Sequence, residues 1–173
     1  MNFEEIGTID DLERVSAEVI WQHFERLTGF IFEKNDFSVS VNIVKTSRRQ
    51  RRQYDVIARR NGRTFLVECK KWAGNRYRLS ALKKAVGQHR ERTAFYEDLT
   101  EEPAVPVVVT LIEETVLVHE GVPLVPITRL DAFIRELDCQ EGEFSFSGFE
   151  ELPDDEGGLG EDQDEEDLAS WME

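Results

Sequence analysis

The Asn61-Gly62 pair, set between two β-type segments, restricts the fold of this chain more than any other feature of its sequence. Asn-Gly is a strong short-range signal for a two-residue hairpin turn, because both residues tolerate the positive φ that such a turn requires. Residues 54–59 and 63–70, on either side of it, have the composition of strands. The unbroken apolar run Phe65-Leu66-Val67 is typical of a strand that is covered on both faces. The sequence therefore predicts an antiparallel hairpin inside a covered sheet.

The rest of the chain predicts an α/β domain around this hairpin. The apolar face that begins after Asp10 or Asp11 favours a helix to Leu27, which Gly29 would end. Alternating or apolar runs predict strands at 37–45, 105–112, 116–118 and 122–127, and two more helical patterns lie at 80–99 and 129–137. We expect one domain, residues 1–140, in which helices flank a central mixed sheet in three layers.

Charge is divided unevenly along the 173 residues, whose formal net charge is −15. Residues 141–173 contain 14 acidic and no basic residues, whereas residues 45–92 contain 16 basic and three acidic residues. The net acidity therefore does not exclude a nucleic-acid partner, because a basic region this dense can bind a polyanion. A structural protein whose basic patch binds RNA or a partner subunit is an alternative. The two cysteines form no disulfide framework and no apolar run could span a bilayer, so we expect a cytoplasmic protein without membrane contact.

Three charged residues of the hairpin are the candidates for chemistry. Strand alternation places Glu68 and Lys70 on one face, and sheet pairing can bring Asp55 of the partner strand beside them. They could equally be the solvent-facing charges of an amphipathic hairpin. Their apolar neighbours favour a pocket instead, where two carboxylates are costly unless a cation compensates them.

The spacing of Asp55 and Glu68-Cys69-Lys70 resembles the PD-(D/E)XK signature of the restriction-endonuclease-like superfamily, with Tyr54 in place of the usual Pro. Over residues 10–137 the chain resembles Mrr-like type IV restriction endonucleases, and archaeal Holliday-junction resolvases share the same core. The resemblance implies a restriction-endonuclease-like fold and a Mg²⁺-dependent DNA endonuclease, with Mn²⁺ as a substitute ion. A catalytically inactive nuclease-fold DNA-binding protein and a structure-specific Holliday-junction resolvase are the alternatives.

The resemblance also implies roles for individual residues. Asp55, Glu68 and the backbone carbonyl of Cys69 would hold one or two Mg²⁺ ions, and Lys70 would orient or deprotonate the attacking water. Glu18 is the candidate for an additional metal-binding carboxylate on the first helix, although a solvated helix face explains it equally well. Gln88 matches a glutamine that some related nucleases place in the active site, but it could also be an ordinary surface residue.

The basic residues and the acidic C-terminal segment indicate partners. DNA backbone is the expected partner of a loop at 46–53 and of the basic residues near the motif, namely Arg48, Arg49, Arg51, Arg52, Lys71, Arg76, Arg78, Lys83 and Lys84. Homodimerisation would let two single-strand sites cut a duplex. We expect residues 141–173 to form a disordered acidic tail whose terminal Leu168, Trp171 and Met172 anchor it to a partner protein or to the basic groove.

Overall fold

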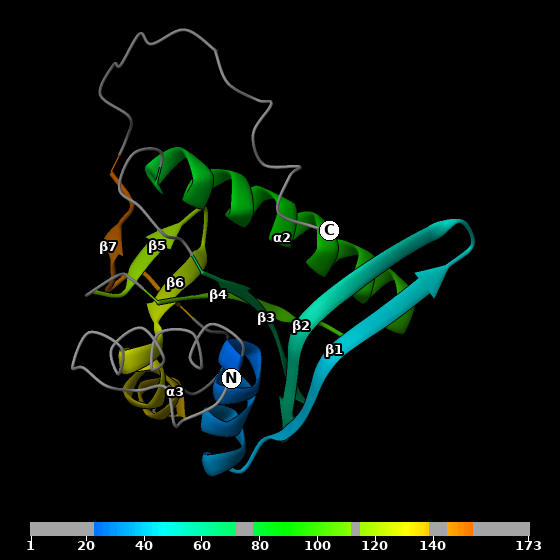
Figure 1. The fold of residues 1–173 in the computed structure, drawn as a ribbon, viewed down its shortest axis with the longest axis horizontal. Helices are drawn as coiled ribbons and strands as arrows, with labels where there is room; N and C mark the ends of the chain where they lie inside the picture. Colours follow the sequence, from blue (N-terminus) through cyan, green and yellow to red (C-terminus); the bar gives the residue numbers. More distant parts are fainter. Residues whose placement is uncertain (1–22, 72–77, 112–114, 139–144, 154–173) are drawn as a thin grey trace, which may run out of the picture.

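The computed structural model of the chain describes residues 23–71, 78–111, 115–138 and 145–153 (Figure 1). Within them lies one seven-stranded sheet of order β1-β2-β3-β4-β6-β5-β7. The strands are β1 (Ser38–Ser47), β2 (Gln50–Arg60), β3 (Arg63–Lys70), β4 (Val105–Thr110), β5 (Leu117–His119), β6 (Val122–Pro126) and β7 (Glu150–Glu151). The helical elements are residues 23–34, α2 (Arg78–Thr100), the short η2 (Ile127–Arg129) and α3 (Leu130–Asp138).

The sheet is mixed, as expected. β1, β2 and β3 form an antiparallel meander, whereas β3, β4 and β6 run parallel to one another, and β5 returns antiparallel to β6. The turn between β2 and β3 contains Asn61 and Gly62, both with positive φ, of 52° and 75°. The predicted hairpin is therefore confirmed, with the backbone geometry that Asn-Gly favours.

Helices cover both faces of the sheet, which gives the expected three layers (Figure 1). On one face, α2 packs Leu82 and Val86 against Val108 and places Tyr96 in a second cluster with Leu66. On the other face, residues of the helix at 23–34 and of α3 share a core with alternate residues of β2, β3 and β4, namely Phe24, Phe32, Phe133, Ile134, Val56, Val67 and Val107. The α/β fold class and its three-layer arrangement are confirmed.

Gly29 does not end the first helix, which continues to residue 34. A Cβ atom at Gly29 would lie 3.1 Å from the Cγ1 atom of Val39 and 3.1 Å from the Cγ2 atom of Val41. The glycine therefore lets the helix approach β1 closely, and the sequence-based prediction of a helix end there is wrong. A glycine at a close contact and a glycine at a helix end look alike in a sequence.

Residues 46–53 are not a loop, because β1 and β2 extend through them to a tight turn at Arg48 and Arg49. Thr46 pairs with Arg51 across the ladder. We call residues 43–54 of this hairpin the arginine arm; it bends away from the sheet toward the end of α2 (Figure 1). The density of arginines suggested a loop, but cross-strand pairing and contacts with α2 stabilise a strand conformation.

Residues 145–153 pack on the domain, although the sequence predicted a disordered tail over residues 141–173. β7 pairs parallel with β5, and Leu152 is buried in the cluster beneath α2. Phe146 and Phe149 contact the ring of Phe133. Three apolar side chains, Phe146, Phe149 and Leu152, make these contacts although acidic residues surround them in the sequence. The acidic composition of the segment as a whole did not indicate this packing. The terminal anchor proposed at Leu168, Trp171 and Met172 lies outside the described residues.

Candidate active site

In the β1–β2 hairpin, the side chains exchange faces of the sheet at Asn42 and Asp55, and this exchange positions the site. Asn42 has a left-handed φ of 55°, and the β1–β2 pairing skips the Asn42–Asp55 position. Before it, Val41 packs on the α3 side of the sheet; beyond it, Ile43 packs with the cluster on the α2 side. The β2–β3 ladder ends at the same level, with the Val56–Val67 pair. Asp55 therefore lies in the fork where β2 leaves β3.

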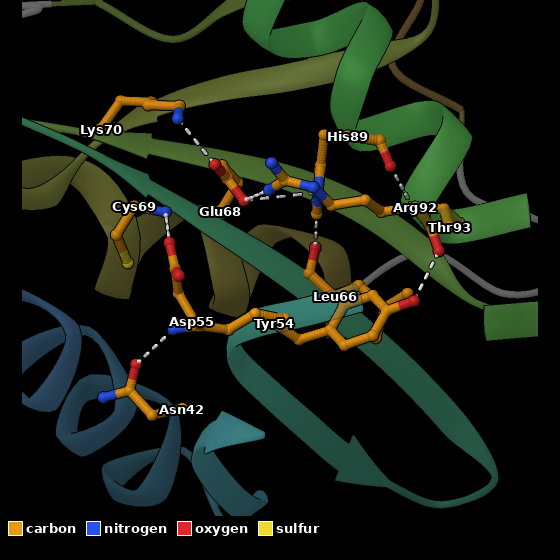
Figure 2. A network of polar contacts seen from close by, with 11 residues as sticks. Asn42, Tyr54, Asp55, Leu66, Glu68, Cys69, Lys70, His89, Arg92 and Thr93 are labelled. Atoms are coloured by element: carbon orange, nitrogen blue, oxygen red, sulfur yellow. Dashed lines mark hydrogen bonds and ion pairs between the residues drawn. The ribbon is translucent and has the colours of Figure 1, made fainter. Parts of the chain in front are cut away.

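Asp55 accepts a hydrogen bond from the backbone N–H of Cys69, with 2.7 Å between the nitrogen and Oδ2 (Figure 2). Burial, followed by the negative charge of Glu68, raises the pKa of Asp55 to about 6, despite the lowering effect of that hydrogen bond. Few positive charges or hydrogen-bond donors therefore stabilise the ionised form of this carboxyl, and a bound cation would stabilise it.

Glu68 is only 5% exposed and is contacted by cations on both carboxylate oxygens. Lys70 Nζ lies 2.7 Å from Oε1, and a terminal guanidinium nitrogen of Arg92 donates to Oε2 at 2.5 Å. Burial alone would raise the pKa of Glu68, but the hydrogen bond and charge of Lys70 and the charge of Arg92 hold it below the ordinary value. Glu68 is therefore an ionised carboxylate, held from two sides (Figure 2).

An open cavity of about 330 Å³ connects these groups with the arginine arm. Its lining residues are Arg51, Arg52, Gln53, Asp55, Glu68 and Arg92. Arg52 lies over the ring of Phe95 on α2, with its guanidinium carbon 5.9 Å from the ring centroid. Two carboxylates and three guanidinium groups thus line one solvent-accessible hollow, and the ammonium of Lys70 is bound to one of these carboxylates. Hydrolysis of a phosphodiester calls for such a set of charges.

The remaining sequence candidates are placed differently. Gln88 is exposed on α2 and does not line the cavity, and Glu18 lies outside the described residues. The Cys69 side chain points to the opposite core, where its sulfur lies 3.5 Å from Thr28 Oγ1, so only its backbone can serve the site. Burial raises the pKa of its thiol.

The expected DNA-binding residues are distributed over the arm and α2. Arg48 and Arg49 form the exposed turn of the arginine arm, and Arg51 and Arg52 line the cavity. Lys71 follows β3, and the exposed or half-exposed Lys83 and Lys84 lie on α2. Arg76 and the Arg78 side chain lie outside the part of the chain described.

Arg92 and His89 belong to the site but were not predicted as site residues. His89 is almost fully buried, and its Nε2 lies 2.8 Å from the carbonyl oxygen of Leu66, so this nitrogen carries the proton. Its Nδ1 atom lies 4.0 Å from Glu68 Oε2, and burial lowers its pKa. The available sequence signal was weak: His89 and Thr93 interrupt the apolar face of α2, and Arg92 lies beside them.

The donor atoms present fit a hard divalent cation. Asp55 and Glu68 line the cavity and offer the oxygen ligands that Mg²⁺ prefers, together with room for water. Within the described ranges, no group of three His, Cys, Asp or Glu side chains could hold a metal ion, so two carboxylates would act with backbone and water oxygens.

Among the helices described, none has the length and apolarity needed to cross a bilayer.

The fold and these residues define a restriction-endonuclease-like domain of the PD-(D/E)XK type. The sequence model of a family described as restriction endonuclease, Mrr_cat, matches residues 16–96. An uncharacterized protein of Archaeoglobus fulgidus is 35% identical over 126 residues, which are 73% of this chain and 98% of that protein. The chain belongs to this restriction endonuclease family, and its domain is of the nuclease type.

Two solved structures are similar to part of this chain at low sequence identity. The crystal structure of AF1548, a protein of unknown function, has a TM-score of 0.45 and 17% identity over 59% of this chain and 55% of its own. VC1899 from Vibrio cholerae has a TM-score of 0.39 and 16% identity over 65% of this chain and 32% of its own. The chain thus spans about half of the first protein and a third of the second.

Proposed function

We propose that this protein is a Mg²⁺-dependent endonuclease that hydrolyses phosphodiester bonds in DNA, with Mn²⁺ as a substitute ion. The observation that carries the proposal is one open cavity lined by Asp55, Glu68 and arginines, with Lys70 bound to Glu68. An amphipathic surface hairpin would leave its carboxylates exposed. Here Glu68 is buried and Asp55 has a pKa raised to about 6, which indicates a site built to hold charge.

Each side chain has a role that follows from its position. Asp55, Glu68 and the Cys69 carbonyl would hold Mg²⁺, which when bound lowers the pKa of water and offsets charge on the phosphorus oxygens. Lys70, held at Glu68 Oε1, presents its remaining N–H donors to the attacking water or to a phosphate oxygen. Arg51 and Arg52, at the edge of the cavity, bind the flanking phosphates.

The arginine arm supports duplex binding near the site. Its turn projects from the sheet, so Arg48 and Arg49 can contact the backbone beyond the scissile position (Figure 1). Lys71, Lys83 and Lys84, with Arg76 and Arg78, would extend the same basic surface. These contacts position the backbone and carry no sequence information by themselves.

Cleavage of three substrates tests the proposal: supercoiled plasmid, a four-way junction and single-stranded DNA, each in Mg²⁺, Mn²⁺ or EDTA. Asp55→Asn, Glu68→Gln and Lys70→Met should each lower the cleavage rate by about 100-fold or more, as loss of a transition-state contact does. Asp98→Asn, which changes an exposed carboxylate of α2, is the matched control and should cleave like the wild type.

The other outcomes select among the alternatives. Metal-independent DNA binding without cleavage would show a catalytically inactive nuclease-fold protein. Strong preference for the junction would show a Holliday-junction resolvase, and the sedimentation of the free protein would show whether it is a homodimer. Cleavage that survives Asp55→Asn and Glu68→Gln would refute the assigned site.

A further inference from the structure

Arg92 reaches the active site from α2, opposite Lys70 (Figure 2). Lys70 Nζ contacts Glu68 Oε1, and Arg92 contacts Glu68 Oε2, so each oxygen of this carboxylate has a cationic partner. Asp55, by contrast, is paired in the described structure with the Cys69 N–H and has a raised pKa. Both cations thus serve one carboxylate while the other is poorly compensated.

The charges of the four side chains balance. With both carboxylates ionised, Asp55 and Glu68 are neutralised by Lys70 and Arg92. A divalent ion would leave two excess positive charges, and a phosphodiester together with a hydroxide nucleophile would bring two negative ones. A divalent ion bound at Glu68 Oε2 would lie close to the Arg92 guanidinium, and the repulsion between the two cations would favour release of this oxygen by Arg92.

Hydrogen bonds hold the backbone around Arg92 in place, but its side chain has room to move within the cavity. The hydroxyl of Tyr54 donates to the Arg92 carbonyl oxygen at 2.7 Å, and one helical turn earlier His89 is bonded to Leu66. The Arg92 side chain is 29% exposed and lines the open cavity where a substrate phosphate would lie. A guanidinium has five N–H donors in a planar fork that matches phosphate oxygens.

We propose that Arg92 changes partner during the reaction. It neutralises Glu68 in the metal-free protein, gives up Glu68 Oε2 to a divalent cation, and then binds a non-bridging oxygen of the scissile phosphate. This inference rests on the proposed function and adds a substrate-contacting residue to it. The simpler alternative is a structural ion pair that only fastens α2 to β3.

Metal affinity in the absence of DNA distinguishes the two. Mn²⁺ binding to the full chain is measured by electron paramagnetic resonance for wild type, Arg92→Met and Arg92→Lys. Removing a competing charge-assisted hydrogen bond should tighten Mn²⁺ binding by about tenfold or more in Arg92→Met. Arg51→Met is the matched control: it removes a positive charge from the same cavity without touching Glu68, and should change Mn²⁺ affinity by about twofold at most.

Single-turnover cleavage at saturating Mn²⁺ provides the second readout. Arg92→Met should cleave about 100-fold more slowly although it binds the ion more tightly, and Arg92→Lys should recover part of the rate. Unchanged or weaker Mn²⁺ binding by folded Arg92→Met would overturn the exchange. If Arg92→Met does not fold, Arg92→Lys decides: wild-type Mn²⁺ affinity and wild-type cleavage together would overturn it.

This inference and the proposed function fail in different ways. A wild-type protein that binds no divalent ion and cleaves nothing would refute the proposed function. A wild type that binds Mn²⁺ and cleaves DNA, with an Arg92→Met variant that binds the ion no more tightly, would refute the exchange alone.

Discussion

Replacing Asp55 with asparagine should stabilise the metal-free protein at neutral and alkaline pH. The pKa of Asp55 is raised from 3.8 to about 6, first by burial and then by the charge of Glu68. Because the folded state binds this proton more tightly than the unfolded chain does, ionisation of Asp55 opposes folding. The opposing free energy is negligible below pH 3.8, grows between pH 3.8 and 6, and is constant above that window.

The size of the effect follows from the shift. It corresponds to about 3 kcal/mol at pH 8 and to roughly half of that at pH 5. The asparagine carbonyl oxygen can still accept the hydrogen bond from the Cys69 N–H, so the variant loses the charge and keeps the contact. In a chain of this size, about 3 kcal/mol raises the Tm by roughly 6–12 °C.

Thermal unfolding in EDTA, followed by circular dichroism at pH 8 and pH 5, measures the gain. Asp98→Asn, at an exposed carboxylate, should shift the Tm by about 1 °C or less at either pH. Glu68→Gln should have the opposite sign at pH 8, because the pKa of Glu68 is lowered and its ionised form supports the fold. That contribution is lost as the pH falls through the folded pKa.

Two results would refute this reasoning about Asp55. One is an Asp55→Asn variant no more stable than the wild type at pH 8, and the other is a gain of equal size at pH 5 and pH 8. Adding Mg²⁺ gives an independent check, because a bound cation offsets the Asp55 charge. The ion should raise the Tm of the wild type more than that of the variant.

Three further predictions concern the arm, the helix contact and the tail. Arg48→Ala with Arg49→Ala should reduce the slope of log K for DNA binding against log salt by about 2 in a filter-binding titration, and an unchanged slope would exclude phosphate contacts at the turn. Gly29→Val should lower the free energy of urea unfolding by roughly 1–3 kcal/mol, because even a Cβ there lies 3.1 Å from Val39; an unchanged midpoint would mean that the contact is not tight. Deleting residues 154–173, which spares β7, should raise DNA affinity at low salt if the acidic tail competes for the basic groove; equal affinity would exclude this autoinhibition.

The central hairpin and the identity of its charged residues could be predicted because both depend on local rules. Asn61-Gly62 specifies its turn through the φ values of two residues, and strand alternation places Glu68 and Lys70 on one face. These relations extend over a few residues, so the sequence itself contains them.

The features that were mispredicted or missed depend on contacts between distant segments. Gly29 is explained by Val39 and Val41, which lie against it only after the helix packs on β1. Arg92 and Glu68 are 24 residues apart in the sequence, and the residues next to Arg92 do not indicate that it pairs with a carboxylate. The arginine arm is likewise strand rather than loop because of its partner strand and α2.

The bend at Asn42 connects the features that depend on local sequence with those that depend on contacts between distant segments. A left-handed residue inside a strand turns the hairpin over, which carries Tyr54 to the α2 side, where its hydroxyl fixes the backbone of Arg92. The same bend leaves Asp55 in the fork beside the Cys69 N–H, with an ionised form that the protein alone compensates poorly. The left-handed backbone of Asn42 and the poorly compensated charge of Asp55 both oppose folding. The two residues lie opposite each other because the same bend in the β1–β2 hairpin places both. The proposed function would therefore account for two features that stability alone does not favour.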